Sequence, residues 1–336
     1  MPFGSALPVV AAPMAGGGTT PALVEAVTTA GGFAFLPAGY KTAEALEEQL
    51  AGLSVEAGVN LFVPSEETIA PDAFRAYADE LQPDADRYGL DLRSATPVVD
   101  DDQWAAKVDV LVAHPVPWVS FTFGLPDAAS ASALRRAGSR LAATVTTVDE
   151  ARRAADFGVD ALVVQGSDAG GHSGTFDPTR PITPTDTAAV VSEVVAATGL
   201  PVVGAGGVDG PERVARVLAA GADAVAVGTL FLRSDEAGTS ATHRAALADP
   251  RFTETTIARA FTGRPARGLR NAFVDAHEAT APVGYPALHH LTRELRAKAA
   301  AAGDPDRVHL WAGTGYRAAE ARPAAEILRG LVTRLH

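Results

Sequence analysis

One histidine, His172, stands in a glycine-rich segment that directly follows a short apolar run. The apolar residues extend from Ala161 to Val164, and the polar amide of Gln165 ends them. Four of the next nine residues are glycine, so the backbone N–H groups of this segment can approach a ligand closely. An imidazole with an ordinary pKa of about 6.5 exchanges a proton near neutral pH. We therefore predict that His172 is a general base held beside a ligand by a glycine loop.

Two more glycine-containing turns follow later apolar runs of the chain. The first includes Gly206 and Gly207, and the second includes Gly228 and Thr229. Free backbone N–H groups at such turns, together with the N-terminus of a following helix, favour an anion such as phosphate. Small residues also allow a helix to pack closely on a strand, so each turn taken alone is weak evidence. The first turn lacks the third glycine of a dinucleotide fingerprint, because Asp209 stands there, and we predict a phosphate site shared by both turns.

Alternating elements must position these turns. Short apolar runs predict eight strands, which are Val9–Met14, Phe33–Pro37, Val59–Val63, Trp118–Phe123, Leu141–Val145, Ala161–Gln165, Val202–Gly206 and Ala224–Leu230. Helices fit between these strands and include Pro21–Ala30, Ala43–Leu53, Val148–Phe157 and Pro211–Ala219. Thr42 and Thr147 are the predicted N-caps of the second and third of these helices. Eight β/α units within about 230 residues favour an α/β fold closed as a TIM (β/α)8 barrel over a doubly wound open sheet.

The chain after the eighth predicted strand does not fit a minimal barrel. Residues 235–307 are rich in helix-forming residues and charges, and Pro265, Pro282 and Pro286 interrupt them. We predict a smaller helical domain, inserted here and packed over the barrel mouth. The barrel would comprise residues 1–234 and be completed by residues 308–336.

Other strand ends carry candidate binding residues, because functional groups of a parallel barrel gather at the carboxyl ends of its strands. Pro13 and Met14 follow the first run, where the chain either faces a planar ligand or makes an ordinary tight turn. Asn60 lies in the third run, where a buried amide must bond the backbone or a ligand. Tyr40 and Lys41 follow the second run and could place an aromatic ring or a cation near the pocket.

Several other chemistries are disfavoured by single residues. Thr175 replaces the last glycine of a G-x-S-x-G nucleophile elbow, which argues against a serine hydrolase. Ala281 stands where a zinc-protease helix beginning at His277 would need its second histidine. We expect the pair His289–His290 to be solvated or at an interface, and Asp100–Asp102 to be a solvated helix start and not a metal site.

Composition limits the class of protein and its partners. The chain has 336 residues, 47% of them hydrophobic, and a net charge of −12, so we predict a packed globular enzyme that does not bind nucleic acid. The chain has no cysteine, which excludes disulfide bonds and a thiolate nucleophile. Because no run of about 18 apolar residues occurs, we expect no membrane contact and a cytoplasmic location. The sequence leaves open whether the chain forms a homodimer.

Five segments in this order resemble the nitronate monooxygenases, formerly called 2-nitropropane dioxygenases. These segments are Ala12–Gly16, Val59–Val63, Gln165–His172, Gly204–Gly207 and Val227–Thr229. Thr262–Asn271 and Trp311–Gly313 also look like segments of that family. The Gln165–His172 run is the most specific of these segments, and the resemblance extends from about Pro8 to Leu328.

The resemblance implies an FMN-dependent barrel in which His172 is the catalytic base. Met14, Asn60 and Gln165 would contact the isoalloxazine ring, and the glycine turns would hold the ribityl and phosphate groups. The full set of residues that would bind FMN is Pro13, Met14, Asn60, Gln165, Gly170, Gly171, Gly206, Gly207, Ala226, Val227, Gly228 and Thr229.

The reaction that the resemblance implies is oxidation of alkyl nitronates, such as propionate 3-nitronate, with O₂ to a carbonyl compound and nitrite. Two alternatives stay open. NADH-dependent flavin reductases of the enoyl-acyl-carrier-protein reductase or quinone reductase type use a similar barrel. A non-redox phosphate-binding barrel, such as an isomerase or a synthase, would use the same glycine turns.

Overall fold

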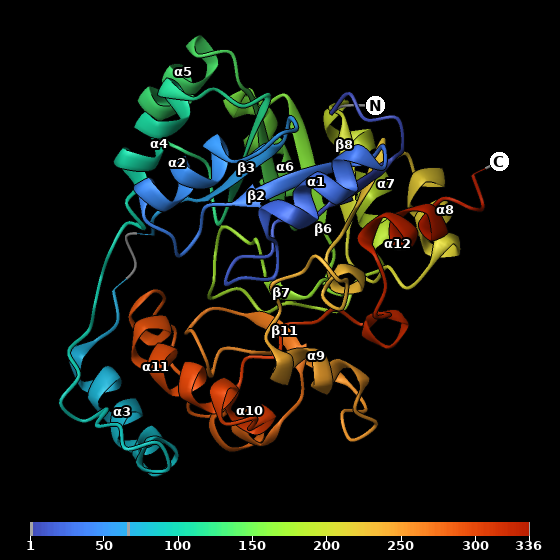
Figure 1. The fold of residues 1–336 in the computed structure, drawn as a ribbon. Helices are drawn as coiled ribbons and strands as arrows, with labels where there is room; N and C mark the ends of the chain where they lie inside the picture. The colour runs from blue at the N-terminus through green and yellow to red at the C-terminus, as the bar shows by residue number, and fades with distance from the viewer. Residues whose placement is uncertain (1–2, 66–67, 336) are drawn as a thin grey trace.

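Eight parallel strands close into a barrel in the computed structural model, which describes residues 3–65 and 68–335 (Figure 1). The strands are β1 (Val9–Ala11), β2 (Phe33–Pro37), β3 (Gly58–Phe62), β4 (Trp118–Thr122), β5 (Arg140–Val145), β6 (Ala161–Gln165), β8 (Val202–Ala205) and β9 (Ala224–Val227). They pair in this order, and β9 pairs back onto β1 with Ala226 opposite Val10. The predicted TIM barrel is confirmed.

Alternate residues of the strands fill the inside of the barrel and the layer outside it. In β2, Phe33 and Phe35 belong to the inner cluster, whereas Leu36 belongs to the cluster that packs against the helices. Phe3 stacks on Phe33 with ring centroids 4.9 Å apart and meets Trp118 edge-on at 4.8 Å. Because Phe33 and Trp118 begin their strands, these rings fill the amino-terminal end of the barrel and leave the carboxyl ends for a site.

Helices cover the outer face of the barrel. They are α1 (Pro21–Thr29), α2 (Ala43–Ala51), α4 (Trp104–Ala113), α5 (Ala128–Arg136), α6 (Val148–Phe157), α7 (Thr187–Thr198), α8 (Pro211–Ala219) and α12 (Ala324–Leu331). The predicted caps are confirmed, because the Thr42 and Thr147 hydroxyls accept from backbone N–H groups in the first turns of α2 and α6. Helix α12 packs against α1 and α8, so the end of the chain joins the outer layer.

Two strands end three residues before the apolar runs that predicted them. The first ends at Ala11 and not at Met14, and the eighth ends at Val227 and not at Leu230. Met14 and Gly228, which lie beyond these ends, line a cavity instead. Apolar composition does not reveal where the ladder stops, because residues that line a cavity are apolar as well.

The chain between β9 and α12 contains strands as well as the helices that the sequence predicted. Its helices are α9 (Ala241–Ala248), α10 (Ala272–His277) and α11 (Ala287–Ala301), with short 3₁₀ turns at Thr229–Phe231, Pro305–Arg307 and Tyr316–Ala318. Strands β10 (Thr255–Ala258) and β11 (Ala266–Leu269) form an antiparallel sheet with β7 (Gly171–His172). The sequence missed these strands because four residues are too few to show a period.

A helix from the first half of the chain packs against this later segment. Helix α3 (Pro71–Asp86) leaves the barrel between β3 and β4, and Figure 1 shows it beside α11. Phe74 and Leu81 of α3 share an apolar cluster with Leu288 and Leu291 of α11. None of the helices within residues 3–65 and 68–335 is long and apolar enough to cross a membrane.

Candidate active site

A cavity of about 570 Å³ lies at the carboxyl ends of the barrel strands. Residues at or beyond the ends of β1, β3, β6, β8 and β9 line one side of it, and residues of α11 and 308–315 line the other. The structure brings every predicted site residue to this cavity. They are Pro13, Met14, Asn60, Gln165, Gly170, Gly171, His172, Gly206, Gly207, Ala226, Val227, Gly228 and Thr229.

Backbone and side-chain hydrogen bonds fix the histidine loop at the rim of the barrel. Strand β7 pairs with β11 so that His172 lies opposite Ala266. The Gln165 side chain donates from Nε2 to the His172 carbonyl at 3.0 Å and accepts with Oε1 from the Gly174 N–H at 2.7 Å. Gln165 therefore holds the loop with both ends of its amide, a contact that the sequence did not indicate.

Asn60 belongs to a row of polar side chains across the top of three strands. It is 2% exposed, and its Nδ2 donates to the hydroxyls of Ser120 and Thr122, each at 3.0 Å. The Thr122 hydroxyl lies 3.5 Å from that of Thr144 on β5. The buried amide thus has partners within the barrel wall, which is the condition under which an amide is tolerated there.

The side chain of His172 lies between a hydroxyl and several aromatic rings. Its Nε2 is 2.9 Å from Thr262 Oγ1, and this hydroxyl is also placed to donate to the Arg264 carbonyl at 3.3 Å. Since a hydroxyl carries one proton, donation to the carbonyl leaves Oγ1 to accept from Nε2–H, and we assign the tautomer with a bare Nδ1 on that basis. The rings of Phe123 and Trp311 lie 5.8 and 5.5 Å from the imidazole.

The imidazole of His172 is uncharged at neutral pH. Burial, and then the cations of Arg264 and Arg296, lower its pKa to about 3. Burial disfavours the charged form because water no longer solvates it, and neighbouring cations add repulsion. The bare Nδ1 is therefore available to accept a proton at any physiological pH. An anion beside the ring is needed to stabilise the imidazolium that this proton creates.

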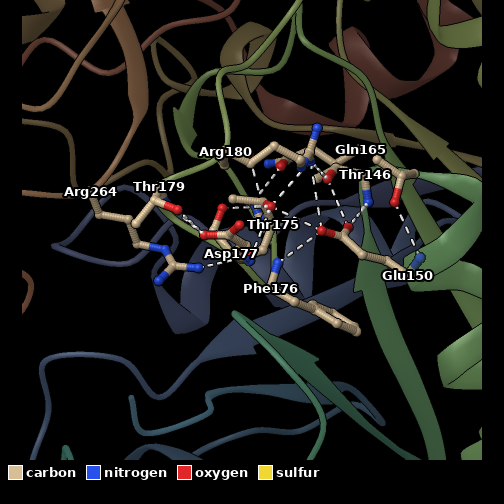
Figure 2. A network of polar contacts seen from close by, with 12 residues as sticks. Thr146, Glu150, Gln165, Thr175, Phe176, Asp177, Thr179, Arg180 and Arg264 are labelled. Carbon is tan, nitrogen blue, oxygen red and sulfur yellow. Dashed lines mark hydrogen bonds and ion pairs between the residues drawn. The ribbon is translucent and has the colours of Figure 1, made fainter. Parts of the chain in front are cut away.

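A hydrogen-bond network behind the site holds Arg264 in place (Figure 2). The guanidinium lies 3.9 Å from the centre of the Phe123 ring and donates to the Thr175 carbonyl. Glu150, a buried residue of α6, accepts from the Thr175 hydroxyl at 2.9 Å and from the Phe176 N–H at 3.0 Å. The Glu150 carboxylate thus holds the loop that follows β7. Through the Thr175 carbonyl, this loop orients Arg264 against the Phe123 ring, which lies next to His172.

Close backbone approaches shape the end of the cavity near β8 and β9. Gly206 and Gly207 have φ of +115° and +70°, a conformation that other residues rarely adopt. A Cβ added to Gly170 would lie 2.4 Å from the backbone nitrogen of Gly313. The Gly313 N–H in turn donates to Thr229 Oγ1 at 2.9 Å. The loops that contain Gly170 and Gly313 thus meet at main-chain distance here, and a side chain at Gly170 would push them apart.

The sequence missed the residues that α11 contributes to the cavity. His289 was expected to be solvated or at an interface, but it is 6% exposed and lines the cavity. Its ring stacks on Tyr40 with centroids 4.1 Å apart, and Arg296 donates to the His289 carbonyl at 2.9 Å. His289, Arg293 and Arg296 are spaced by four and three residues, so they share one face of the helix, and this spacing is a signal that could have indicated them. Tyr40 was expected near the pocket, and it does line the cavity.

The α11 side of the cavity is basic although the whole chain has a net charge of −12. Arg293 and Arg296 line it together with His243, His289 and His309. In the described part of the chain, Asp168 is the only acidic residue that lines the cavity, and it lies 3.5 Å from Arg213. No group of three or more potential metal ligands occurs among the described residues. The cavity therefore favours an anionic ligand.

The fold and the cavity define an α/β-barrel enzyme with an uncharged histidine beside glycine turns that suit a phosphate. The family model for nitronate monooxygenase matches residues 3–334. A probable nitronate monooxygenase of Staphylococcus aureus (strain Newman) is 34% identical over 98% of this chain and 94% of that protein. The chain therefore belongs to the nitronate monooxygenase family and is an oxidoreductase of this flavin-dependent family.

Solved structures agree with this assignment. A nitroalkane oxidase from Streptomyces ansochromogenes superposes with a TM-score of 0.91 and 42% identity, over 98% of this chain and 96% of that chain. FabK from Thermotoga maritima superposes with a TM-score of 0.74 over 98% and 93% of the two chains, at 23% identity. The second likeness shows the fold alone.

Replacing Gly170 with alanine should destabilise the protein. Its Cβ would meet the backbone of Gly313, which cannot rotate away, and overpacking of this kind costs about 1–3 kcal/mol. Urea unfolding measures the free energy of unfolding directly. Gly330→Ala in α12 is the control, because nothing lies within 4 Å of the added Cβ, and it should not destabilise. A Gly170→Ala protein as stable as the parent would show that these loops are not in close contact.

Acid should destabilise the fold through the cavity histidines. Burial lowers the pKa of His172 to about 3 and that of His243 to about 4, and it also lowers the pKa of His289 and His309. Histidine in an unfolded chain titrates near pH 6.5. Below that pH the unfolded chain binds protons that the native protein does not. The free energy of unfolding therefore decreases as the pH is lowered below about 6.5, by at most about 1.4 kcal/mol per pH unit for each histidine.

Urea titrations at pH 7.5 and 5.5 test this dependence. His243→Gln should make the free energy of unfolding less dependent on pH, because it removes one imidazole whose pKa burial lowers to about 4. Equal stability of the parent protein at both pH values would contradict burial of uncharged imidazoles.

Proposed function

We propose that this protein oxidises alkyl nitronates, such as propionate 3-nitronate, with O₂ to a carbonyl compound and nitrite, using FMN. The observation that carries the proposal is one cavity that joins glycine turns after β8 and β9 to a partly buried, uncharged histidine. Family membership supports the class of reaction, and the 42% identical nitroalkane oxidase acts, by its name, on related compounds.

The residues at the β8 and β9 ends fit an FMN phosphate. Gly206 and Gly207 present main chain and no side chains, and Thr229 adds a hydroxyl. The nearest lining carboxylate, Asp168, is paired with Arg213 and so repels an anion less. Bound FMN would supply the electron acceptor that the oxidation requires. The predicted contacts of Met14, Asn60 and Gln165 with its ring system are part of this proposal, as are those of Pro13, Gly170, Gly171, Ala226, Val227 and Gly228.

His172 is proposed as the base that removes the α-proton from a neutral nitroalkane. Its Nδ1 would accept the proton while Nε2–H remains donated to Thr262. The lowered pKa means that the imidazolium is stable only while the nitronate anion stands beside it, so the proton is retained as one member of an ion pair. A nitronate supplied as the anion has already lost this proton and does not need the base.

The basic side of the cavity suits a substrate with a second negative charge. Arg296 is buried, and burial lowers its pKa to about 10, which still leaves the guanidinium charged at neutral pH. Arg293 lies on the same helix face and is exposed. A carboxylate such as that of propionate 3-nitronate would find a cation here without an acidic competitor. Charge-assisted contacts of this kind are among the stronger hydrogen bonds.

We also propose the organisation of the chain into two domains. Residues 1–234, completed by 308–336, would form the FMN-binding barrel, and residues 235–307 would form a subdomain over its mouth. The packing of α12 on α1 and α8 supports the first part, and the cavity residues of α11 support the second.

The flavin spectrum and its response to two electron donors test the proposed function. The purified protein should absorb near the bands of oxidised flavin, and the cofactor released by heat should be FMN. Anaerobic mixing with propionate 3-nitronate should bleach the spectrum faster than mixing with NADH. Rapid bleaching by NADH alone would instead support the flavin-reductase alternative, and a colourless protein that binds no added FMN would exclude both.

Replacing His172 with asparagine should separate the two forms of the substrate. We expect kcat/KM for a neutral nitroalkane to fall about 10²–10⁴-fold, the range of general base catalysis, while kcat/KM for its preformed nitronate changes little. FMN content should stay unchanged. His114→Asn is the control, because this half-exposed residue pairs with Glu47 on the outer helices. Equal decreases of kcat/KM for the nitroalkane and the nitronate would contradict the role of His172 as the base.

A further inference from the structure

The loop of three aspartates before α4 contacts the wall of the cavity. The sequence predicted a solvated helix start at Asp100–Asp102, but Asp102 does more than begin a helix. Its Oδ1 accepts from the Tyr40 N–H at 3.0 Å, and its Oδ2 lies 2.7 Å from Nζ of Lys107. The Lys107 side chain is 1% exposed, so the carboxylate neutralises a buried cation while it binds the backbone of another loop.

Both loops at this junction have uncommon backbone conformations. Tyr40 has φ of +67°, and Asp102 and Gln103 have φ of +54° and +55°. Residues other than glycine enter this region only where the surrounding contacts hold them there. Gln103 supplies one more such contact, because its Oε1 accepts from the Ala43 N–H at 2.8 Å. Residues 102 and 103 therefore bind the backbone N–H groups on both sides of residues 41–42.

The conformation of Tyr40 decides where its ring lies in the cavity. The ring stacks on His289 with an angle of 4° between the planes, and it meets Phe62 edge-on at 5.4 Å. Its hydroxyl is 3.4 Å from that of Tyr285, whose ring lies 5.8 Å from the His172 imidazole. Tyr40 therefore joins the barrel to α11 and to the aromatic residues around the proposed base.

A second contact connects the same loop to α11. Asp100 Oδ2 lies 2.6 Å from Nε2 of His290, the residue next to His289. One short loop thus contacts the backbone of Tyr40 and the side chain of His290, which follows His289 in the sequence. These two contacts connect the barrel side of the cavity to its α11 side.

We propose that Asp102 is a positioning residue for the substrate-side wall of the cavity. Its carboxylate, anchored by Lys107, holds Tyr40 in the left-handed conformation in which the ring can stack on His289. Asp102 does not line the cavity and acts through Tyr40. The inference rests on the proposed use of this cavity as the active site. A merely structural ion pair between Asp102 and Lys107 would stabilise the fold without governing Tyr40.

Two double variants separate these roles. Removing Asp102 alone would leave the Lys107 cation buried without a partner, which can prevent folding. Lys107→Met removes this charge and keeps the apolar stem. Asp102→Asn/Lys107→Met retains an oxygen that can accept from the Tyr40 N–H, whereas Asp102→Ala/Lys107→Met does not. The two proteins therefore differ in this one acceptor. Asp109→Asn, on the exposed face of α4, controls for loss of a negative charge.

Hydrogen exchange of the Tyr40 amide is the readout that does not depend on activity. We expect the alanine double variant to exchange this amide at least about tenfold faster than the asparagine one, as loss of an ordinary hydrogen bond implies. Asp109→Asn should match the parent. Equal protection of the Tyr40 amide in both double variants would overturn the proposal, whatever reaction the enzyme performs.

Kinetics with propionate 3-nitronate provide the second readout. The alanine double variant should raise KM by about tenfold with kcat nearly unchanged, because the wall contributes to binding and not to proton transfer. The asparagine double variant should restore the parent KM. Equal KM values in the two double variants would overturn the role in substrate binding. If the parent protein does not oxidise the nitronate, the proposed function fails, and the exchange experiment still decides whether Asp102 positions Tyr40.

Discussion

The pairing of β7 with β11 is the constraint on which the site depends. Strand β7 has only two residues, so it gains its conformation from β11 and from the Gln165 side chain that binds the same loop. This pairing places the His172 imidazole between the end of the barrel and the segment that follows β9. Thr262 and Arg264 come from the turn just before β11, so one local structure supplies the partner of Nε2 and a nearby cation.

Desolvation by burial explains how basic groups coexist in the cavity. Burial keeps the histidines uncharged, and the buried arginines nevertheless remain cations because their ordinary pKa is so high. The result is a cavity with a fixed positive charge on the α11 side and an uncharged proton acceptor near its centre. The buried carboxylate of Glu150 does not line the cavity and instead accepts from the Thr175 hydroxyl and the Phe176 N–H of the loop after β7. The cavity therefore favours anions.

The sequence revealed the parts of the molecule whose determinants are local. Alternating apolar runs predicted the closed barrel, and glycines next to a polar residue marked His172, Gly206 and Gly207 at the strand ends. The contribution of α11 could not be predicted in the same way, because burial of His289 depends on Tyr40, which lies far away in the chain. The sequence likewise predicted a solvated Asp102, because its partner Tyr40 lies 62 residues away in the chain. Strands β10 and β11 were missed because they are short and pair with each other and with a two-residue strand.

The contact between His172 and Thr262 joins residues that are 90 positions apart. A contact of this kind requires the closing of a long loop, which costs conformational entropy before the contact stabilises the fold. During synthesis the ribosome completes all eight barrel strands before it adds the threonine. A nascent chain released at that stage would possess the glycine turns but lack the partner that orients the imidazole. The glycine turns and the hydroxyl that orients the imidazole are therefore added to the polypeptide at different stages of its synthesis.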